Sequence, residues 1–325
     1  MKLVITDCDH ADIAAEEAVA MKHGAELVLS RCHTEDDVIE AASGADGILV
    51  QYAPITERVL SALPRLRAIG RYGVGVDTVD VEAASRHNVA VCNVPDYGTE
   101  DVSDHAIALA LTLSRKIAHF DRRVRRGESR LAPAEPIHRF SSMTFGVIGM
   151  GLIGSATARK ARGLGFKVIG HDRLAEAGDS NADGIPCVSL EELYAVSDVV
   201  SLHLPLAADT HHLIDAHALA RFRDGALLIN TSRGGIVDTE AVVEALSSGK
   251  LRGAGLDVFE QEPLPFDHPL AQLENTVLTP HVAWYSAESY NELKRRTIEN
   301  VVEYCAGRRP RNILNESALE RKVIG

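Results

Sequence analysis

The chain has 325 residues, of which 46% are hydrophobic and 25% are charged. This composition is close to that of soluble globular proteins and argues against a disordered chain. At about 150 residues per domain, the length predicts two domains. The net charge of −12 is a poor match for nucleic-acid phosphates or for an anionic membrane surface. We therefore expect neither nucleic acid nor a membrane as a partner.

The five cysteines are scattered, odd in number and form no Cys-x-x-Cys pair. This pattern does not favour a disulfide framework or a zinc site, so we expect no metal. The N-terminus lacks the basic and apolar regions of a signal peptide. No apolar run approaches the roughly 18 residues that a membrane helix needs. We therefore expect a cytoplasmic protein.

The first third of the chain alternates short apolar runs with helical patterns. Strands are predicted at residues 3–6, 26–29, 47–51, 66–69 and 90–93, and helices at 14–23, 35–42, 56–62 and 81–86. This alternation predicts βαβ units and a parallel sheet. A single long helix over 99–126 is predicted next, because Ala106, Ala110, Leu113 and Ile117 recur at three- and four-residue spacing.

The strand–helix pattern then restarts. Strands are predicted at 145–148, 167–169, 199–204, 226–229, 253–258 and 277–279, and helices at 153–164, 190–195, 216–222, 240–247 and 288–304. We predict an α/β protein with two doubly wound parallel sheets. In this prediction a Rossmann coenzyme domain, residues 101–284, is inserted into a discontinuous flavodoxin-like substrate domain, residues 1–100 and 285–325.

Gly149, Gly151 and Gly154 form a Gly-x-Gly-x-x-Gly motif between a predicted strand and a predicted helix. In the dinucleotide-binding fingerprint, these glycines make the turn, admit the pyrophosphate and allow close packing. A tight turn without a nucleotide is the alternative. Asp172 ends the next strand, where a carboxylate bonds the adenosine ribose and repels a 2′-phosphate. This favours NAD over NADP, although the adjacent Arg173 is suited to a 2′-phosphate.

Other polar residues lie at or just beyond the ends of later predicted strands, namely Arg233, Asp257, Glu262 and His281. In open α/β sheets, ligands bind outside the carboxyl ends of the strands. An arginine there grips a carboxylate through a two-point fork. A carboxylate bonded to one ring nitrogen of a histidine raises the imidazole pKa and keeps a proton available near neutral pH. Taken singly, Arg233 could instead form a surface ion pair and His281 could be structural.

Four motifs in this order resemble the D-isomer-specific 2-hydroxyacid dehydrogenases. They are the glycine motif at 149–154, NTSRGGIVD at 230–238, GLDVFEQEP at 255–263 and TPH at 279–281. GVGVD at 73–77 and NVP at 93–95 extend the likeness over nearly the whole chain. Within the family, RYG at 71–73, AVCNVP at 90–95 and HVAWYS at 281–286 are most similar to the C-terminal binding proteins and their bacterial relatives.

The resemblance implies an NAD-dependent oxidoreductase that interconverts a 2-oxo acid and a D-2-hydroxy acid by hydride transfer. It implies that Arg233 binds the substrate carboxylate, that His281 is the general acid and base, and that Glu262 pairs with His281. The implied cofactor contacts are Gly149, Gly151, Leu152, Ile153, Gly154, Asp172, Leu204, Pro205, Thr210, Thr231, Ser232, Arg233, Asp257 and His281. The implied substrate contacts are Arg71, Tyr72, Gly73, Val74, Gly75 and Trp284.

Trp284, the sole tryptophan, is interpreted as a wall of the substrate pocket, with core packing as the alternative. Together with Tyr72 it suggests a substrate with a medium-sized apolar or sulfur-containing side chain. The resemblance also implies a homodimer built around the helix that begins near Thr99. His105, in that helix, is interpreted as a hydrogen-bonding residue at the helix start. The alternative function is an NAD(H)-responsive binding protein of the C-terminal binding protein type, with secondary dehydrogenase activity.

Overall fold

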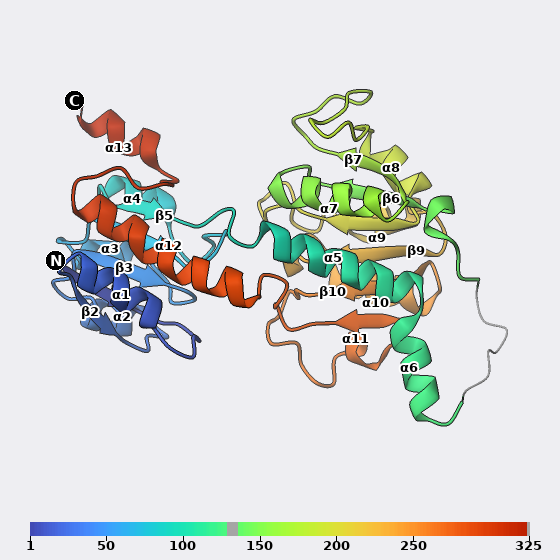
Figure 1. Cartoon of the computed structure of the whole chain (residues 1–325), viewed down its shortest axis with the longest axis horizontal. Coiled ribbons are helices and arrows are strands. Elements are labelled where there is room, and N and C mark those ends of the chain that lie inside the picture. The colour runs from blue at the N-terminus through green and yellow to red at the C-terminus, as the bar shows by residue number, and fades with distance from the viewer. Residues whose placement is uncertain (129–135, 324–325) are drawn as a thin grey trace. The chain divides into compact units, whose positions relative to one another are not determined.

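The computed structural model describes residues 1–128 and 136–323. The described chain forms two compact units (Figure 1). Unit 1 comprises Met1–Tyr97 and Ser286–Gly325, and unit 2 comprises Gly98–Tyr285.

Unit 1 is built on a parallel sheet whose strand order is β2-β1-β3-β4-β5, the flavodoxin-like order. Its strands are β1 (Lys2–Ile5), β2 (Glu26–Leu29), β3 (Gly47–Val50), β4 (Ala68–Arg71) and β5 (Ala90–Cys92). Its helices are α1 (Ala14–Lys22), α2 (Glu35–Ala41), α3 (Glu57–Ala62), α4 (Val81–Arg86), α12 (Ala287–Cys305) and α13 (Glu316–Val323).

Helix α12 packs directly on β3 and β4, beside α1. Glycine is needed beneath it, because a Cβ on Gly47 or Gly70 would come within 2.4 or 2.7 Å of the Val301 side chain. The C-terminal segment therefore completes the core that the N-terminal residues begin.

Unit 2 contains a six-stranded sheet in the order β11-β10-β9-β8-β6-β7, and all its pairings are parallel. The strands are β6 (Thr144–Ile148), β7 (Lys167–His171), β8 (Val199–Leu202), β9 (Ala226–Asn230), β10 (Leu251–Leu256) and β11 (Thr276–Leu278). Cys187 forms a parallel bridge with Gly170 of β7, which adds one rung where a Rossmann sheet has its third strand. The order then reverses between β6 and β8, so a ligand-binding switch point lies at the carboxyl ends of these two strands.

The helices of unit 2 are α5 (Thr99–Ser114), α6 (Ile117–Arg125), α7 (Leu152–Gly163), α8 (Leu190–Val196), α9 (Ala216–Arg221), α10 (Thr239–Ser247) and α11 (Pro269–Gln272), with 3-10 turns at Phe140–Ser142 and Gly234–Ile236. The predicted elements of both units are present, with ends within two residues of those expected, except for one helix. Among the described residues, no helix has both the length and the apolar character needed to cross a membrane.

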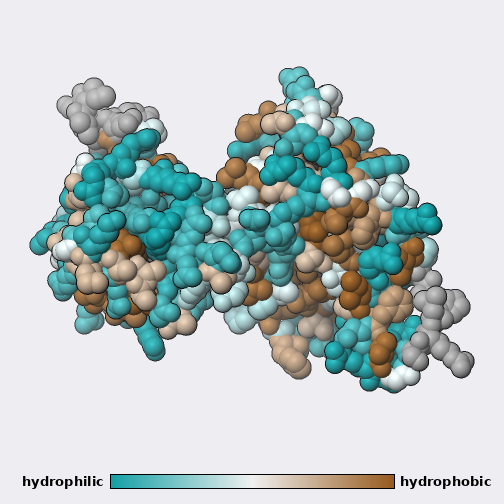
Figure 2. Space-filling model, in the orientation of Figure 1, coloured by the Kyte–Doolittle hydropathy of each residue, from teal (hydrophilic) through white to brown (hydrophobic). Residues whose placement is uncertain are grey.

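The prediction of one helix over 99–126 was wrong. Helix α5 stops at Ser114, and Lys116 adopts a left-handed conformation with φ of 53° before α6 begins. The periodic pattern hid this break because Ile117 continues the apolar spacing across it. Helix α6 buries none of its residues, and Ile117 and Val124 are more than half exposed. Figure 2 shows hydrophobic surface along the region of unit 2 that carries α5 and α6.

Candidate active site

The turn between β6 and α7 has the geometry of a pyrophosphate cradle. Gly149 has a φ of 90°, and a Cβ there would lie 2.3 Å from the carbonyl oxygen of His203. A Cβ on Gly154 would lie 1.8 Å from the carbonyl oxygen of Gly149. Gly151, which precedes α7, has open space where its Cβ would be. The outer glycines are therefore required by the fold, while Gly151 and the first N–H groups of α7 leave room for a phosphate to approach.

Asp172 lies against this turn at the end of β7. Its Oδ2 accepts a 2.8 Å hydrogen bond from the backbone N–H of Met150, and its Oδ1 accepts one of 3.0 Å from Leu174. Arg173 points elsewhere, because its guanidinium pairs with Asp209 at 2.9 Å. A carboxylate is thus fixed beside the glycine turn, where it fits a ribose hydroxyl better than a phosphate.

The loop after β8 carries the next predicted cofactor residues. The Thr210 hydroxyl donates to the carbonyl oxygen of Pro205 at 2.7 Å and accepts from the N–H of Ala207 at 2.8 Å. Leu204 is half-buried and Pro205 is exposed. Thr210 therefore holds the loop after β8 in a tight turn at the carboxyl edge of the sheet, next to the switch point.

Arg233 follows β9 in a turn that Asn230 holds together. The Asn230 amide donates to the carbonyl oxygen of Arg233 at 2.9 Å and accepts from the N–H of Ser232 at 3.0 Å. The Ser232 hydroxyl donates to the carbonyl oxygen of Leu202, at the end of β8, at 2.6 Å. Gly234 is required, because a Cβ there would lie 1.9 Å from the backbone of Phe259. These contacts fix the half-buried Arg233 at the carboxyl edge of the sheet.

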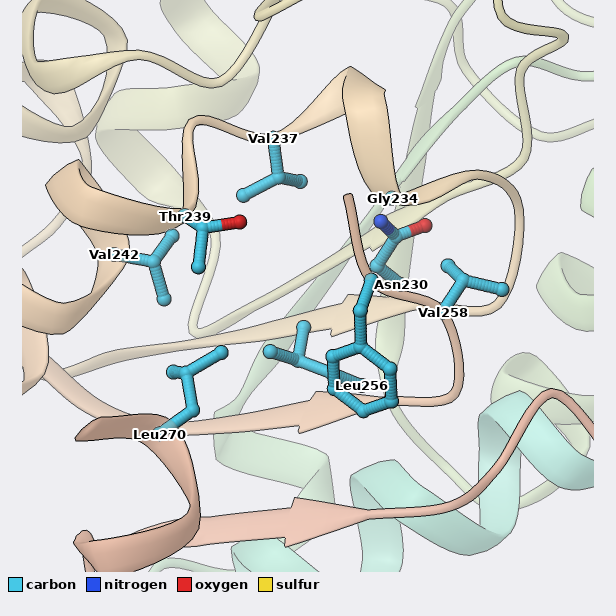
Figure 3. A pocket seen from close by; sticks show the side chains of 9 residues that line it. Asn230, Gly234, Val237, Thr239, Val242, Leu256, Val258 and Leu270 are labelled. Atoms are coloured by element: carbon cyan, nitrogen blue, oxygen red, sulfur yellow. The ribbon is translucent and has the colours of Figure 1, made fainter. Parts of the chain in front are cut away.

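A small, mostly apolar pocket lies between this turn, the ends of β9 and β10, and the start of α10 (Figure 3). It is lined by Asn230, Gly234, Val237, Thr239, Val242, Leu256, Val258, Phe259 and Leu270. Since none of these side chains titrates, the pocket lining supplies no acid or base.

Glu262 and His281 form a direct pair. Nδ1 of His281 lies 2.8 Å from Oε2 of Glu262, whose Oε1 accepts the N–H of Phe259 at 2.9 Å. Partial burial raises the pKa of the Glu262 carboxyl, but the hydrogen bonds from His281 and Phe259 and the nearby charge of Arg233 outweigh it and leave the pKa below its usual value. Glu262 is therefore ionised at neutral pH. The structure thus pairs Glu262 with His281 and places the charge of Arg233 close enough to act on the Glu262 carboxylate.

His281 lies in a turn that Asp257 anchors. The N–H of His281 donates to the carbonyl oxygen of Asp257 at 2.7 Å. The Asp257 carboxylate accepts the N–H groups of Val282 and Ala283 at 3.0 and 2.9 Å, and the indole N–H of Trp284 donates to the carbonyl oxygen of His281 at 3.0 Å. Asp257 is fully buried, so its side chain supports the turn instead of presenting an open acceptor to a cofactor.

Sequence reasoning missed two members of this network, His105 and Thr279. His105 was interpreted as hydrogen bonding at the helix start, but its Nε2 lies 2.9 Å from the hydroxyl of Thr279, which donates in turn to Asp257. Thr279 precedes the proposed acid by two residues and His105 lies on a distant helix. No local spacing links the two positions, so only the fold reveals the contact.

In unit 1, the side chain of Tyr72 is buried and is not placed as the substrate contact that the resemblance implied. Its ring is 2% exposed and packs edge-on against His10, and its hydroxyl donates to Glu16 at 3.0 Å. The ring lies in the core because its hydroxyl is bonded there to the buried Glu16 carboxylate. Next to it, Gly73 has a φ of 135° and the Arg71 side chain lies over it. Trp284 and Tyr72 together suggested a medium-sized apolar substrate, and the buried Tyr72 ring no longer supports that preference.

Within the described residues, no group of three or more His, Cys, Asp or Glu side chains is placed to hold a metal ion.

A family model described as D-isomer specific 2-hydroxyacid dehydrogenase, NAD binding domain, matches residues 107–283. The chain belongs to this family. It is an oxidoreductase with a nicotinamide-dinucleotide-binding domain, and both of its parallel sheets agree with the two-domain fold of the family's solved structures.

Several relatives are similar over most of their length. The chain is 38% identical to a glyoxylate reductase of Korarchaeum cryptofilum, covering 89% of this chain and 88% of that protein. It is 36% identical to a glycerate dehydrogenase of Methylorubrum extorquens, covering 86% and 89%. These relatives are named as a reductase and a dehydrogenase, not as C-terminal binding proteins.

Among solved structures, the chain is similar to D-lactate dehydrogenase from Aquifex aeolicus complexed with NAD and lactic acid, with a TM-score of 0.82 and 30% identity over 94% of this chain and 96% of that one. It is also similar to an acyclic imino acid reductase in complex with NADPH and D-Arg, with a TM-score of 0.88 and 31% identity over 97% and 100%. The family fold therefore accommodates both nicotinamide cofactors.

Proposed function

We propose that this dehydrogenase reduces small 2-oxo acids of the glyoxylate and hydroxypyruvate type to 2-hydroxy acids, with NADH as the reductant. Relatives named for these activities support the substrate class. The observation that carries the proposal is the 2.8 Å contact between Glu262 and His281, together with Arg233 at the same sheet edge. The C-terminal binding protein likeness rests on short segments only.

His281 acts as the acid in reduction. Because Nδ1 donates to the Glu262 carboxylate, Nε2 is the nitrogen available to the substrate. It donates its proton to the carbonyl oxygen of the 2-oxo acid. The reduced nicotinamide, when bound, would supply the hydride for the carbonyl carbon. The product is the 2-hydroxy acid, and neutral His281 then takes a proton from solvent. In oxidation the same nitrogen accepts the hydroxyl proton.

Arg233 binds the substrate carboxylate. A guanidinium supplies two parallel N–H donors, which fix the plane of the carboxylate and with it the orientation of the adjacent carbonyl. The substrate contacts that the resemblance implies from the backbone of Tyr72, Gly73, Val74 and Gly75 and from the side chain of Arg71 remain part of the proposal. The fixed orientation lowers the entropy cost of the hydride step.

NADH is proposed as the preferred cofactor because Asp172 lies against the glycine turn. Its negative charge repels a 2′-phosphate, and Arg173 is held by Asp209. The contacts from Leu152, Ile153, Thr231 and Ser232 remain part of the proposal. Asp257 keeps a supporting role instead of direct contact through its side chain.

A homodimer through α5 and α6 is also proposed. Ile117, Phe120 and Val124 share one face of α6 at helical spacing, and none of them is buried. Covering this face with the same surface of a second copy would remove apolar area from water.

The function is tested by mixing the purified protein with NADH or NADPH and a panel of 2-oxo acids that includes glyoxylate, hydroxypyruvate, pyruvate and a branched-chain 2-oxo acid. Oxidation of the cofactor is followed by its absorbance. We expect the highest kcat/KM with glyoxylate or hydroxypyruvate and NADH. Absence of turnover with every acid would refute the proposal, and a preference for the branched-chain acid would overturn its substrate class.

A further inference from the structure

His105 lies in the second turn of α5, far in sequence from the proposed acid. Its Nε2 is 2.9 Å from Oγ1 of Thr279 and 3.6 Å from Oδ1 of Asp257. The His105 side chain is 24% exposed and the Asp257 side chain is fully buried. His105 thus lies beside the Asp257 carboxylate, which anchors the His281 turn.

The direction of these hydrogen bonds follows from the donors available. Thr279 has one hydroxyl proton, and its Oγ1 lies 2.5 Å from Oδ1 of the Asp257 carboxylate. That proton therefore points at the carboxylate, and the Thr279 oxygen accepts from His105. Nε2 of His105 must carry a hydrogen, which fixes the tautomer of its neutral form.

The turn that this chain supports is conformationally demanding. His281 has a φ of 53°, in the left-handed region that is unfavourable for a residue other than glycine. Such a conformation persists where the surroundings over-determine it. Here Asp257 accepts the N–H groups of three consecutive residues, from His281 to Ala283, through its carbonyl and both carboxylate oxygens. Rotation of the Asp257 side chain would release two of those bonds.

We propose that His105 is a positioning residue for His281. Its Nε2–H holds the Thr279 hydroxyl, Thr279 holds the rotamer of Asp257, and Asp257 fixes the left-handed turn that presents the His281 ring. His105 touches no reacting atom in this account. The inference rests on the proposed role of His281, and it adds a residue of α5 to the machinery that sets the geometry of that ring.

The test compares His105→Ala, His105→Gln and the control Asp104→Asn in the intact protein. The amide nitrogen of glutamine can reach the position of Nε2 and donate to Thr279, whereas alanine cannot. Asp104 is the neighbouring residue on the same helix, but it faces Lys160 at 2.6 Å and not the His281 turn. Thermal melting establishes that each variant is folded.

We expect His105→Ala to lower kcat on the order of tenfold, as a misplaced catalytic group does, with a change in KM for NADH below about twofold. His105→Gln should recover most of the loss, and Asp104→Asn should match the wild type. Thr279→Val should lower kcat as His105→Ala does, and the double variant should be no worse than either single variant, because the two residues act in one chain.

A readout without catalysis separates this inference from the proposed function. Trp284 is the sole tryptophan, and its indole is bonded to the carbonyl of His281, so its fluorescence reports on the turn. His105→Ala should increase acrylamide quenching of Trp284, whereas Asp104→Asn should not. Unchanged quenching and kcat in His105→Ala would overturn the positioning role, as would equal losses in the Ala and Gln variants. Absence of turnover in the wild type, with altered quenching in His105→Ala, would refute the proposed function alone.

Discussion

Nδ1 of His281 lies 2.8 Å from a carboxylate oxygen of Glu262, while the His281 backbone N–H is bonded to Asp257. One acidic residue thus orients the ring and the other fixes the backbone beneath it. Because Nδ1 is bonded to Glu262, Nε2 is the ring nitrogen of His281 that can serve a substrate.

Glu262→Gln should lower kcat for reduction by about 10²-fold, the lower end of the range for a general acid–base contribution. Glutamine retains an oxygen near Nδ1 but removes the negative charge beside the ring. Steady-state kinetics at saturating cofactor measure the effect. Because the pKa of Glu262 lies below its usual value, the wild-type carboxylate stays charged at pH 5, and its contribution fades only as the pH falls through the lowered pKa. A wild-type rate that fell through pH 6 on account of Glu262 would contradict this account.

Arg233→Lys should raise KM for the 2-oxo acid and reduce kcat/KM by roughly 10²-fold, because an ammonium group cannot form the two-point fork. Arg173→Lys is the control, since Arg173 is an exposed partner of Asp209. A substrate KM unchanged by Arg233→Lys would remove Arg233 from carboxylate binding.

Asp172→Asn should lower KM for NADPH by about tenfold relative to NADH, because the repulsion of the 2′-phosphate is lost. Asparagine keeps an oxygen for the N–H of Met150, so the glycine turn should hold. The ratio of kcat/KM for the two cofactors is the measurement. Wild-type enzyme that already prefers NADPH would show that the Asp172 charge does not set the choice.

Unit 1 should lose stability as the pH rises from 6.5 to 9. Burial lowers the pKa of His10, but Cys8 and Glu16 beside its ring raise it more strongly, to about 9. A folded-state pKa above the unfolded value stabilises the fold fully below pH 6.5, and the stabilisation is lost as the pH rises through 9. The expected loss is on the order of 1–3 kcal/mol. Calorimetry of the wild type and His10→Gln should show a smaller pH dependence in the variant, and parallel profiles would contradict the assignment.

Ile117→Asp combined with Val124→Asp should convert the proposed dimer to a monomer. Two charges on the apolar face of α6 would be buried without partners in the interface. Light scattering coupled to size exclusion measures the mass, with the exposed, distant Leu174→Asp as the control. A wild-type monomer at micromolar concentration would contradict the interface.

The sheets could be predicted because each strand is a short apolar run beside a helical pattern, and the parallel order follows from that alternation. The positions of the glycine turn, Arg233, Glu262 and His281 beyond strand ends could be predicted because each lies in a recognisable local motif that follows an apolar strand; their roles remain predictions. Tyr72 could not be placed, since its hydroxyl finds Glu16 across 56 residues. The same holds for His105 and Thr279, which are 174 residues apart and meet only through packing. The break at Lys116 was missed because the apolar spacing continues across it.

The most direct test of the account is His281→Gln. Glutamine places a nitrogen near the position of Nε2 but has no transferable acidic proton. The rate of 2-oxo acid reduction is measured at saturating NADH, with NADH binding followed by fluorescence. The account predicts a loss of kcat on the order of 10²–10⁴-fold while NADH still binds. A variant that binds NADH and reduces the acid at the wild-type rate would contradict it.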